Sequence, residues 1–194
     1  MTKKTLFIIC LLAATSLKAE IIDRMVAVVN NHIITLSDLR REREIRTVLG
    51  IAEPKDDKTI LRELIDAQII EDQIAQFPGI DVTETQLDSE LKKHADLRGV
   101  SPEVLREAIL RRLRASEFVQ VRFRQFIRPT DEEVRNYYRT VFVPRAERQG
   151  MTPIPSFEQI EEAVRMNVTE EKVAHEIENW LDAIRRRSDI EVFD

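Results

Sequence analysis

The stretch that most constrains the fold runs from Pro102 to Ile127 and contains neither glycine nor an internal proline. At 3.6 residues per turn it predicts a helix of about seven turns, which would be the longest rod in the fold. One broad, mostly apolar face predicts that this helix packs on a core. That face consists of Leu105, Ala108, Ile109, Leu113, Ala115, Ser116, Val119, Phe123, Phe126 and Ile127.

A second apolar stripe lies on the opposite side of the same helix. It consists of Leu110, Phe118 and Val121. A helix that is apolar on two sides is either sandwiched between other elements or shows one stripe to something outside the domain. The sequence leaves both interpretations open. Under the second, the stripe is a candidate binding surface. A dense aromatic cluster further along the chain is another candidate surface and consists of Tyr137, Tyr138 and Phe142.

Residues 1–19 have the pattern of a secretory signal peptide. Lys3 and Lys4 precede an apolar run over residues 6–14, which is too short for a comfortable membrane span. We expect cleavage after Ala19 and export of the rest of the chain. An uncleaved anchor is the alternative, and it is the only membrane attachment that the sequence suggests.

Composition limits the classes of function. The single cysteine, Cys10, lies in the predicted signal, so the remaining 175 residues (194 − 19) must be stabilised by a hydrophobic core rather than by disulfides. Removing three signal lysines changes the net charge from −5 to −8 (−5 − 3). An acidic exported protein is a poor candidate for nucleic-acid binding.

Positive charge is concentrated between Arg106 and Arg128, where seven arginines stand against Glu107 and Glu117. Such a run is typical of a solvated face whose arginines pair with acidic neighbours, for example on the glutamate-rich segment after Ser156. The alternative is contact with an anionic surface or with acidic segments of another polypeptide.

Two short β segments frame the chain. Residues 22–29 are rich in β-branched side chains, Asn30 and Asn31 fit a tight turn, and Ile33-Ile34 resume an extended run, so we expect a hairpin. The tail over residues 189–193 alternates in polarity and is predicted to be a strand. Since the only other strands are at the start, we expect the tail to pair with the hairpin.

Helices are predicted for most of the intervening chain. Capping pairs mark their starts at Thr35/Asp38, Thr83/Gln86, Thr130/Glu133 and Ser156/Gln159, and Ser101-Pro102 begins the long rod. A core helix is expected over residues 59–77. Residues 144–155, with three prolines and a glycine, are predicted to be a loop and the one hinge. The fold class is therefore mainly α, with a small β element.

The sequence offers no candidate catalytic residue, metal site or cofactor site. His32, His94 and His175 are far apart, and none has a second ligand at a credible spacing. Nucleophile, phosphate-loop and zinc-protease motifs are not found, and four glycines in 194 residues leave little room for a phosphate-cradling loop.

Five segments in order resemble the SurA-type periplasmic chaperone family, relatives of the parvulin-type foldases. They are IIDRMVAVVNNHIITLSDL, LRELIDAQIIEDQIAQF, IDVTETQLDSELKK, RPTDEEVRNYYR and a final piece from SFEQIEEAVR to ENWLDAIRRRSDIEVF. Members of that family carry parvulin isomerase domains where this chain has only residues 144–155. The parvulin histidines and glycine-rich segment are also not seen.

The resemblance implies a single chaperone domain over residues 20–194, without the isomerase. Its expected activity is ATP-independent holding of unfolded polypeptides, in particular outer-membrane proteins, in the periplasm. Apolar helix faces would bind these clients, with no cofactor, metal or nucleic acid. The candidate client-binding residues are Leu110, Phe118, Val121, Tyr137, Tyr138 and Phe142. The alternatives are a parvulin-family peptidyl-prolyl isomerase and a structural subunit of an envelope complex.

Overall fold

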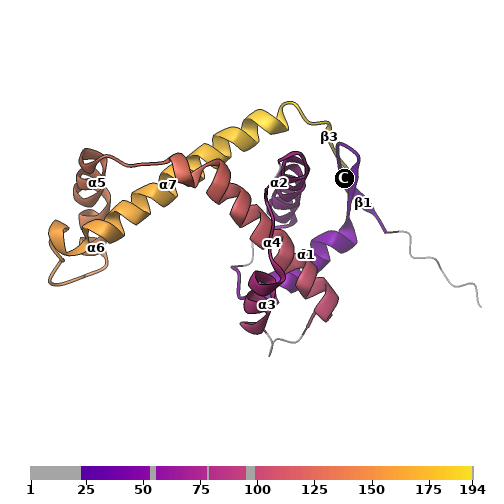
Figure 1. The fold of residues 1–194 in the computed structure, drawn as a ribbon, viewed down its shortest axis with the longest axis horizontal. Coiled ribbons are helices and arrows are strands. Elements are labelled where there is room, and N and C mark those ends of the chain that lie inside the picture. Colours follow the sequence, from indigo (N-terminus) through magenta and orange to yellow (C-terminus); the bar gives the residue numbers. More distant parts are fainter. Residues whose placement is uncertain (1–22, 53–55, 78, 95–98, 194) are drawn as a thin grey trace, which may run out of the picture.

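The computed structural model describes residues 23–52, 56–77, 79–94 and 99–193, so the predicted signal peptide lies outside the described residues. Figure 1 shows a mainly helical protein with one small sheet, as the sequence predicted. The strands are β1 (Met25–Val29), β2 (His32–Thr35) and β3 (Ile190–Val192). The helices are α1 (Leu36–Val48), α2 (Asp57–Gln76), α3 (Glu84–Lys92), α4 (Pro102–Arg122), α5 (Asp131–Tyr137), α6 (Val143–Arg148) and α7 (Phe157–Arg185), with a 3₁₀ turn η1 (Arg124–Phe126) and a π-helical segment η2 (Tyr138–Phe142).

The sheet has the order β2-β1-β3, and both pairs are antiparallel. The hairpin turns at Asn30, whose φ of 53° is the positive value that a tight turn needs. Beside it, the Asn30 N–H donates to the carbonyl of Asp189 at 2.7 Å. The prediction that the tail returns to the hairpin is therefore confirmed.

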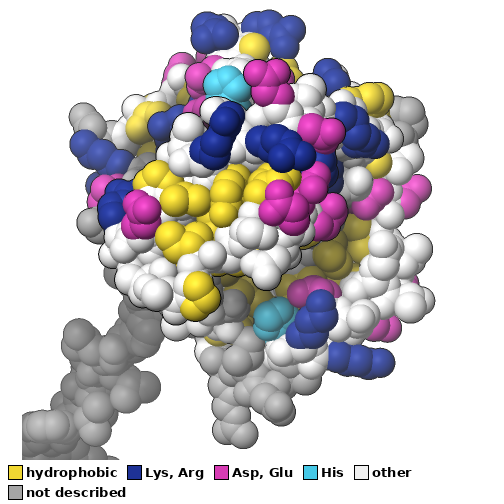
Figure 2. All heavy atoms as spheres, turned by 90° about the vertical axis from the view of Figure 1, so that its left-hand side faces the viewer, with side chains coloured by type: hydrophobic (Ala, Val, Ile, Leu, Met, Phe, Trp, Pro, Cys, Tyr) yellow, Lys and Arg dark blue, Asp and Glu magenta, His cyan; other side chains and the backbone are white. Residues whose placement is uncertain are grey.

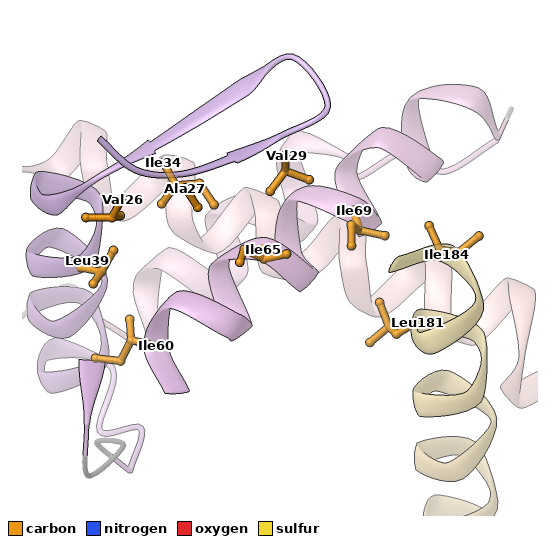
Figure 3. Packing of buried hydrophobic residues seen from close by; sticks show 10 residues of the cluster. All are labelled: Val26, Ala27, Val29, Ile34, Leu39, Ile60, Ile65, Ile69, Leu181 and Ile184. Carbon is orange, nitrogen blue, oxygen red and sulfur yellow. The ribbon is translucent and has the colours of Figure 1, made fainter. Parts of the chain in front are cut away.

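The main core lies beneath this sheet. Side chains from β1 and β2 pack on α1 and α2, and the last turns of α7 close one side, as Figure 3 shows. The buried residues of this cluster are Val26, Ala27, Val29, Ile34, Leu39, Ile60, Ile65, Ile69, Leu181 and Ile184. Because they come from both ends of the described chain, the core fixes the first strand and the last helix together.

The predicted helix starts are confirmed by their caps. Thr35, Thr83, Thr130 and Ser156 each head a capping box with the residue three positions on. The start of α2 differs from the prediction, since its cap is Asp56, whose carboxylate accepts the Thr59 N–H at 2.8 Å. The helix therefore begins two residues before residue 59.

The prediction that residues 102–127 form the longest rod is wrong. The α4 helix ends at Arg122, because Phe123 leaves helical geometry with φ −126° and ψ −63°, and η1 follows. The longest helix is α7, with 29 residues against 21 in α4. At 1.5 Å per residue, α7 is about 43 Å long.

The far end of α7 carries a separate small core, which we call the distal lobe (residues 131–168). In Figure 1, α5 and α6 pack beside the start of α7, away from the sheet. Val134, Phe157, Val164 and Val168 are its buried residues. The predicted loop over residues 144–155 is partly wrong, because residues 143–148 form α6. Only residues 149–155 remain without a helix or strand.

Candidate functional site

An open groove lies between β2, α1, α2 and α4, with a volume of about 560 Å³. A smaller hollow of about 200 Å³ continues it between α1, α2 and α4, because the two share several lining residues. The apolar side chains of the main groove are Ile33, Ile34, Ile45, Leu64, Ala67, Ala75 and Leu110. The groove therefore offers apolar surface from four elements to anything that enters it.

Charged side chains also line the groove, and they pair with one another. Arg41 contacts Asp38 at 3.1 Å, and Arg111 contacts Glu107 at 3.4 Å. These exposed pairs add little stability. Asp72, also in the lining, has His32 as its only basic partner among the described residues, at 3.4 Å.

The groove lining contains a buried carboxylate oxygen that accepts no hydrogen bond from the described residues. Glu71 lies on α2 and pairs through Oε2 with Arg114 of α4 at 3.0 Å. Its second oxygen, Oε1, is buried and has no hydrogen-bond partner among the described residues. A buried acceptor left unpaired costs about 1–3 kcal/mol. A donor that reached this oxygen would recover part of that free energy.

A charged cluster holds the helices around the groove in place. Glu42 of α1 accepts from Arg46 at 2.9 Å and from Arg112 of α4 at 3.0 Å. Burial lowers the pKa of the Arg112 guanidinium below its usual value, while the Glu42 carboxylate acts in the opposite direction. Arg46 also pairs with Glu63 of α2, so the cluster joins three helices.

The six predicted binding residues lie in three separate places. Leu110 lines the groove, half-buried on α4. Val121 is half-buried at the other end of α4, against a cluster that includes Ile74 and Ile80. The structure therefore does not join Leu110 and Val121 into one exposed stripe.

Of the two interpretations of the second stripe, the structure excludes the exposed one at Phe118. Its side chain is only 2% exposed. The ring packs against Phe77, Phe123 and Trp180, with centroids 5.9, 6.1 and 5.5 Å away. The sandwiched interpretation of α4 therefore holds at this position, because residues at the end of α2 and in the last third of α7 cover it.

The tyrosine cluster belongs to the distal lobe. Tyr138 stacks on Phe142 with centroids 5.6 Å apart, and its hydroxyl donates to the carbonyl of Pro155 at 2.8 Å. The Tyr137 hydroxyl donates to Glu171 at 2.9 Å, and burial together with this bond raises the Tyr137 pKa. Both tyrosines thus anchor the lobe to its own loop and to α7.

The distal lobe nevertheless has an apolar outer surface. Figure 2 shows a band of hydrophobic side chains across the end of the molecule that carries this lobe. Val141, Met151 and Met166 are 39%, 42% and 58% exposed. This is a second surface that could contact an unfolded chain.

A third apolar surface, which the sequence did not predict, lies where α4 gives way to η1. A hollow of about 520 Å³ is lined there by Phe123, Phe126, Ile127 and Trp180 among other residues. Phe126 is 72% exposed, although it was predicted to face the core. The η1 turn redirects its side chain, and no periodicity in the sequence signals that turn.

The arginine run of α4 and η1 is largely paired, as the first of the two interpretations predicted. Its partners are mostly on α1, α2 and α3 rather than on the glutamate-rich α7. The pairs with other elements are Arg106 with Glu84 and Asp88, Arg112 with Glu42, Arg114 with Glu71, and Arg124 with Glu170. Only the Arg124 pair reaches α7.

Across the parts of the chain that the structure describes, no group of three or more His, Cys, Asp and Glu side chains is placed to hold a metal ion. Within the same ranges, every helix is too short or too polar to span a bilayer.

Comparison with known proteins gives one informative similarity. No model of a known protein family matches the chain. Over 126 residues the chain is 32% identical to the chaperone SurA of Cupriavidus pinatubonensis. The match covers 61% of this chain but 24% of that protein, so the chain spans about a quarter of the length of this relative. The comparison supports a SurA-like relationship.

Proposed function

We propose that the protein is an ATP-independent chaperone that binds unfolded polypeptides, in particular outer-membrane proteins, in the periplasm. The similarity to SurA is the observation that carries this proposal. Residues 20–194 would form one chaperone domain, with residues 1–19 removed on export. The groove between β2, α1, α2 and α4 would be the principal binding surface, and the distal lobe would add a second one.

The chemistry of the groove suits a client of variable sequence. Apolar lining gains free energy from burying apolar client side chains, at about 25 cal/mol per Å². Most charges on the walls are paired, which limits how strongly the groove selects one client charge over another, although its five carboxylates against three arginines would disfavour strongly acidic clients. We expect clients to bind in this open groove without a chemical step or a bound cofactor.

A matched pair of variants tests the groove. Ala67 is half-buried on α2 and lines both the main groove and its smaller continuation. Ala67→Arg should obstruct the groove and weaken suppression of the aggregation of an unfolded outer-membrane protein. Ala174→Arg, at an exposed position of α7 that lines neither the groove nor the distal lobe, is the matched control and should keep nearly all of the protection. Circular dichroism would check that both variants fold.

The outcomes separate the proposal from its rivals. A wild-type chain that does not slow aggregation would contradict the chaperone proposal. Acceleration of prolyl isomerisation, which is slow without catalysis, would favour the isomerase instead. A fixed oligomer at high dilution would favour a structural subunit. The processing part of the proposal predicts that protein recovered from the periplasm begins at Glu20, as intact mass would show.

A further inference from the structure

β2 is an edge strand of the three-stranded sheet, and its outer side has no strand partner among the described residues. The hydrogen-bond pattern identifies the residue of β2 that faces outward. The Asn30 N–H bonds to Asp189, and the Val26 carbonyl accepts from Phe193. In β1, the N–H and C=O groups of even-numbered residues therefore point toward β3. Those of odd-numbered residues point toward β2.

The register of the hairpin extends this parity to β2. Val29 lies opposite His32, Val28 opposite Ile33, and Ala27 opposite Ile34. His32 and Ile34 therefore bond to β1. The N–H and C=O of Ile33 point away from the sheet, because in an antiparallel pair alternate residues face opposite edges.

The groove lies against this edge rather than against a face of the sheet. His32, Ile33 and Ile34 all line it, although side chains of consecutive strand residues point to opposite faces. A hollow that touches all three must border the strand from the side. On its other sides the same groove is lined by α1, α2 and α4.

We propose that the free edge of β2 binds an extended segment of a client polypeptide by main-chain pairing at Ile33, while the client side chains lie in the groove. This inference rests on the proposed chaperone function and specifies how the groove holds its client. An added strand is a known mode of peptide recognition in which backbone hydrogen bonds supply affinity.

The chemistry of the edge favours this occupant. An outward N–H and C=O on one extended residue match the donor and acceptor of another extended backbone, whatever the side chains are. The edge is also short, because the next backbone donor, the N–H of Thr35, is already bonded to the Asp38 carboxylate at 2.9 Å. A short edge limits indiscriminate pairing with other copies of the chain.

Three variants separate backbone pairing from side-chain contact. Ile33→Pro removes the outward donor and leaves the bonds of His32 and Ile34 to β1. Ile33→Thr keeps the donor and removes most of the apolar side chain, which is 61% exposed. Val192→Pro is the matched control, because by the same parity its N–H faces outward on the opposite edge, at β3.

The probe is a fluorescent peptide of alternating valine and threonine with a lysine at each end. We expect Ile33→Pro to bind it about five- to tenfold more weakly than wild type, as loss of one hydrogen bond implies. Ile33→Thr, which loses only an apolar contact, should bind more tightly than Ile33→Pro, and Val192→Pro should bind nearly as wild type does. Unchanged affinity in Ile33→Pro, or equal loss in Val192→Pro, would overturn the inference.

A second measurement uses the unaltered protein, so it holds even where Ile33→Pro does not fold. Two versions of the same peptide would be tested, one N-methylated on its odd-numbered amides and one on its even-numbered amides. At least one of them should bind less tightly than the parent peptide. Equal binding of both methylated peptides and the parent would contradict strand pairing. If aggregation of the outer-membrane protein is still suppressed in that case, the chaperone proposal stands and only the binding mode fails.

Discussion

Phe118 joins three segments that are far apart in the sequence. Its ring contacts Phe77 after α2, Phe123 at the end of α4 and Trp180 on α7. Phe123 and Trp180 also contact each other, with centroids 5.6 Å apart. Aromatic pairs of this kind add about 0.5–1.5 kcal/mol each beyond the burial of their area. The cluster therefore connects α2 and α4 to the last third of α7.

Phe118→Ala should destabilise the protein by about 3–5 kcal/mol, because it removes a buried ring and leaves a cavity. Chemical denaturation followed by the fluorescence of Trp180, the single tryptophan, measures this change directly. Phe126→Ala is the control: its side chain is 72% exposed, and the expected change is within about 0.5 kcal/mol. Equal destabilisation by the two substitutions would contradict the buried placement of Phe118.

The burial of Phe118 also explains why helical periodicity alone could not decide whether its face is covered. In its first half, α4 buries Leu105 and Ile109 against α3 and its neighbours. Phe118 lies nine residues after Ile109 (118 − 109), which is about two and a half turns and places it on the opposite side of the helix. The helix thus buries one face near its start and the other near its end. Periodicity revealed both faces, but only the tertiary neighbours decide which is covered.

At the level of elements, local signals predicted the helix starts far better than their ends. Each capping box is formed by side chains three residues apart, so it is visible in the sequence. The end of α4 has no comparable signal, since the chain leaves the helix at Phe123, six residues before Pro129 (129 − 123). Packing of Phe123 against Trp180 accompanies that exit and depends on a distant helix.

The cap of α5 makes stability depend on acid pH. A hydrogen bond from Lys172, followed by the backbone N–H of Thr130, holds the pKa of Glu133 below its usual value. A carboxylate with a lowered folded-state pKa stabilises the fold above its unfolded pKa of about 4.3, and this stabilisation is lost as the pH falls through the folded value. The melting temperature should therefore decrease when the pH is lowered below about 4.5.

Glu133→Gln isolates this contribution, because glutamine still accepts from Thr130 but carries no charge. Its melting temperature should fall less between about pH 6 and pH 3 than that of wild type, as thermal scans at each pH would show. Glu132→Gln is the matched control, since the structure shows no ion pair for Glu132 within the described residues. An identical pH profile in Glu133→Gln and wild type would exclude this role for Glu133.

The contribution of the last strand, β3, to the stability of the fold can also be tested. β3 is only three residues long and pairs with β1 through Ala27, Val28 and Val29. A two-stranded hairpin is marginal in isolation, and a third strand supports it. Deleting residues 188–194 should lower the melting temperature substantially, while Glu191→Gln, which keeps the strand, should change it little. A deletion that left the melt unchanged would show that the tail adds nothing to the fold.

For the whole molecule, the sequence predicted the closure of the chain but not its division into two parts. The tail had to pair with the hairpin because no other strands were available, and β3 does so. The distal lobe was not foreseen. Its core combines Val134 with Val164 and Val168, residues that the sequence assigned to separate helices on either side of a loop.

The two parts share α7 and few other contacts, so they should open independently. Val164 is 1% exposed in the distal lobe, and Val164→Ala should lower the opening free energy of that lobe by about 1–2 kcal/mol. Hydrogen exchange should then speed up in α5 and at the start of α7, while amides of β1 exchange as in wild type. Ile69→Val, in the core beneath the sheet, is the reciprocal control.

The pattern of hydrogen exchange distinguishes independent opening of the distal lobe from cooperative opening of the whole chain. Faster exchange confined to the distal lobe would mean that the lobe can unfold locally while the groove and the β2 edge stay folded. A client could then contact both surfaces without a fixed distance between them. If Val164→Ala instead speeds exchange in β1 as much as in α5, the chain opens as one cooperative unit. The long α7 helix would then be a rigid strut that sets the spacing between the two apolar surfaces.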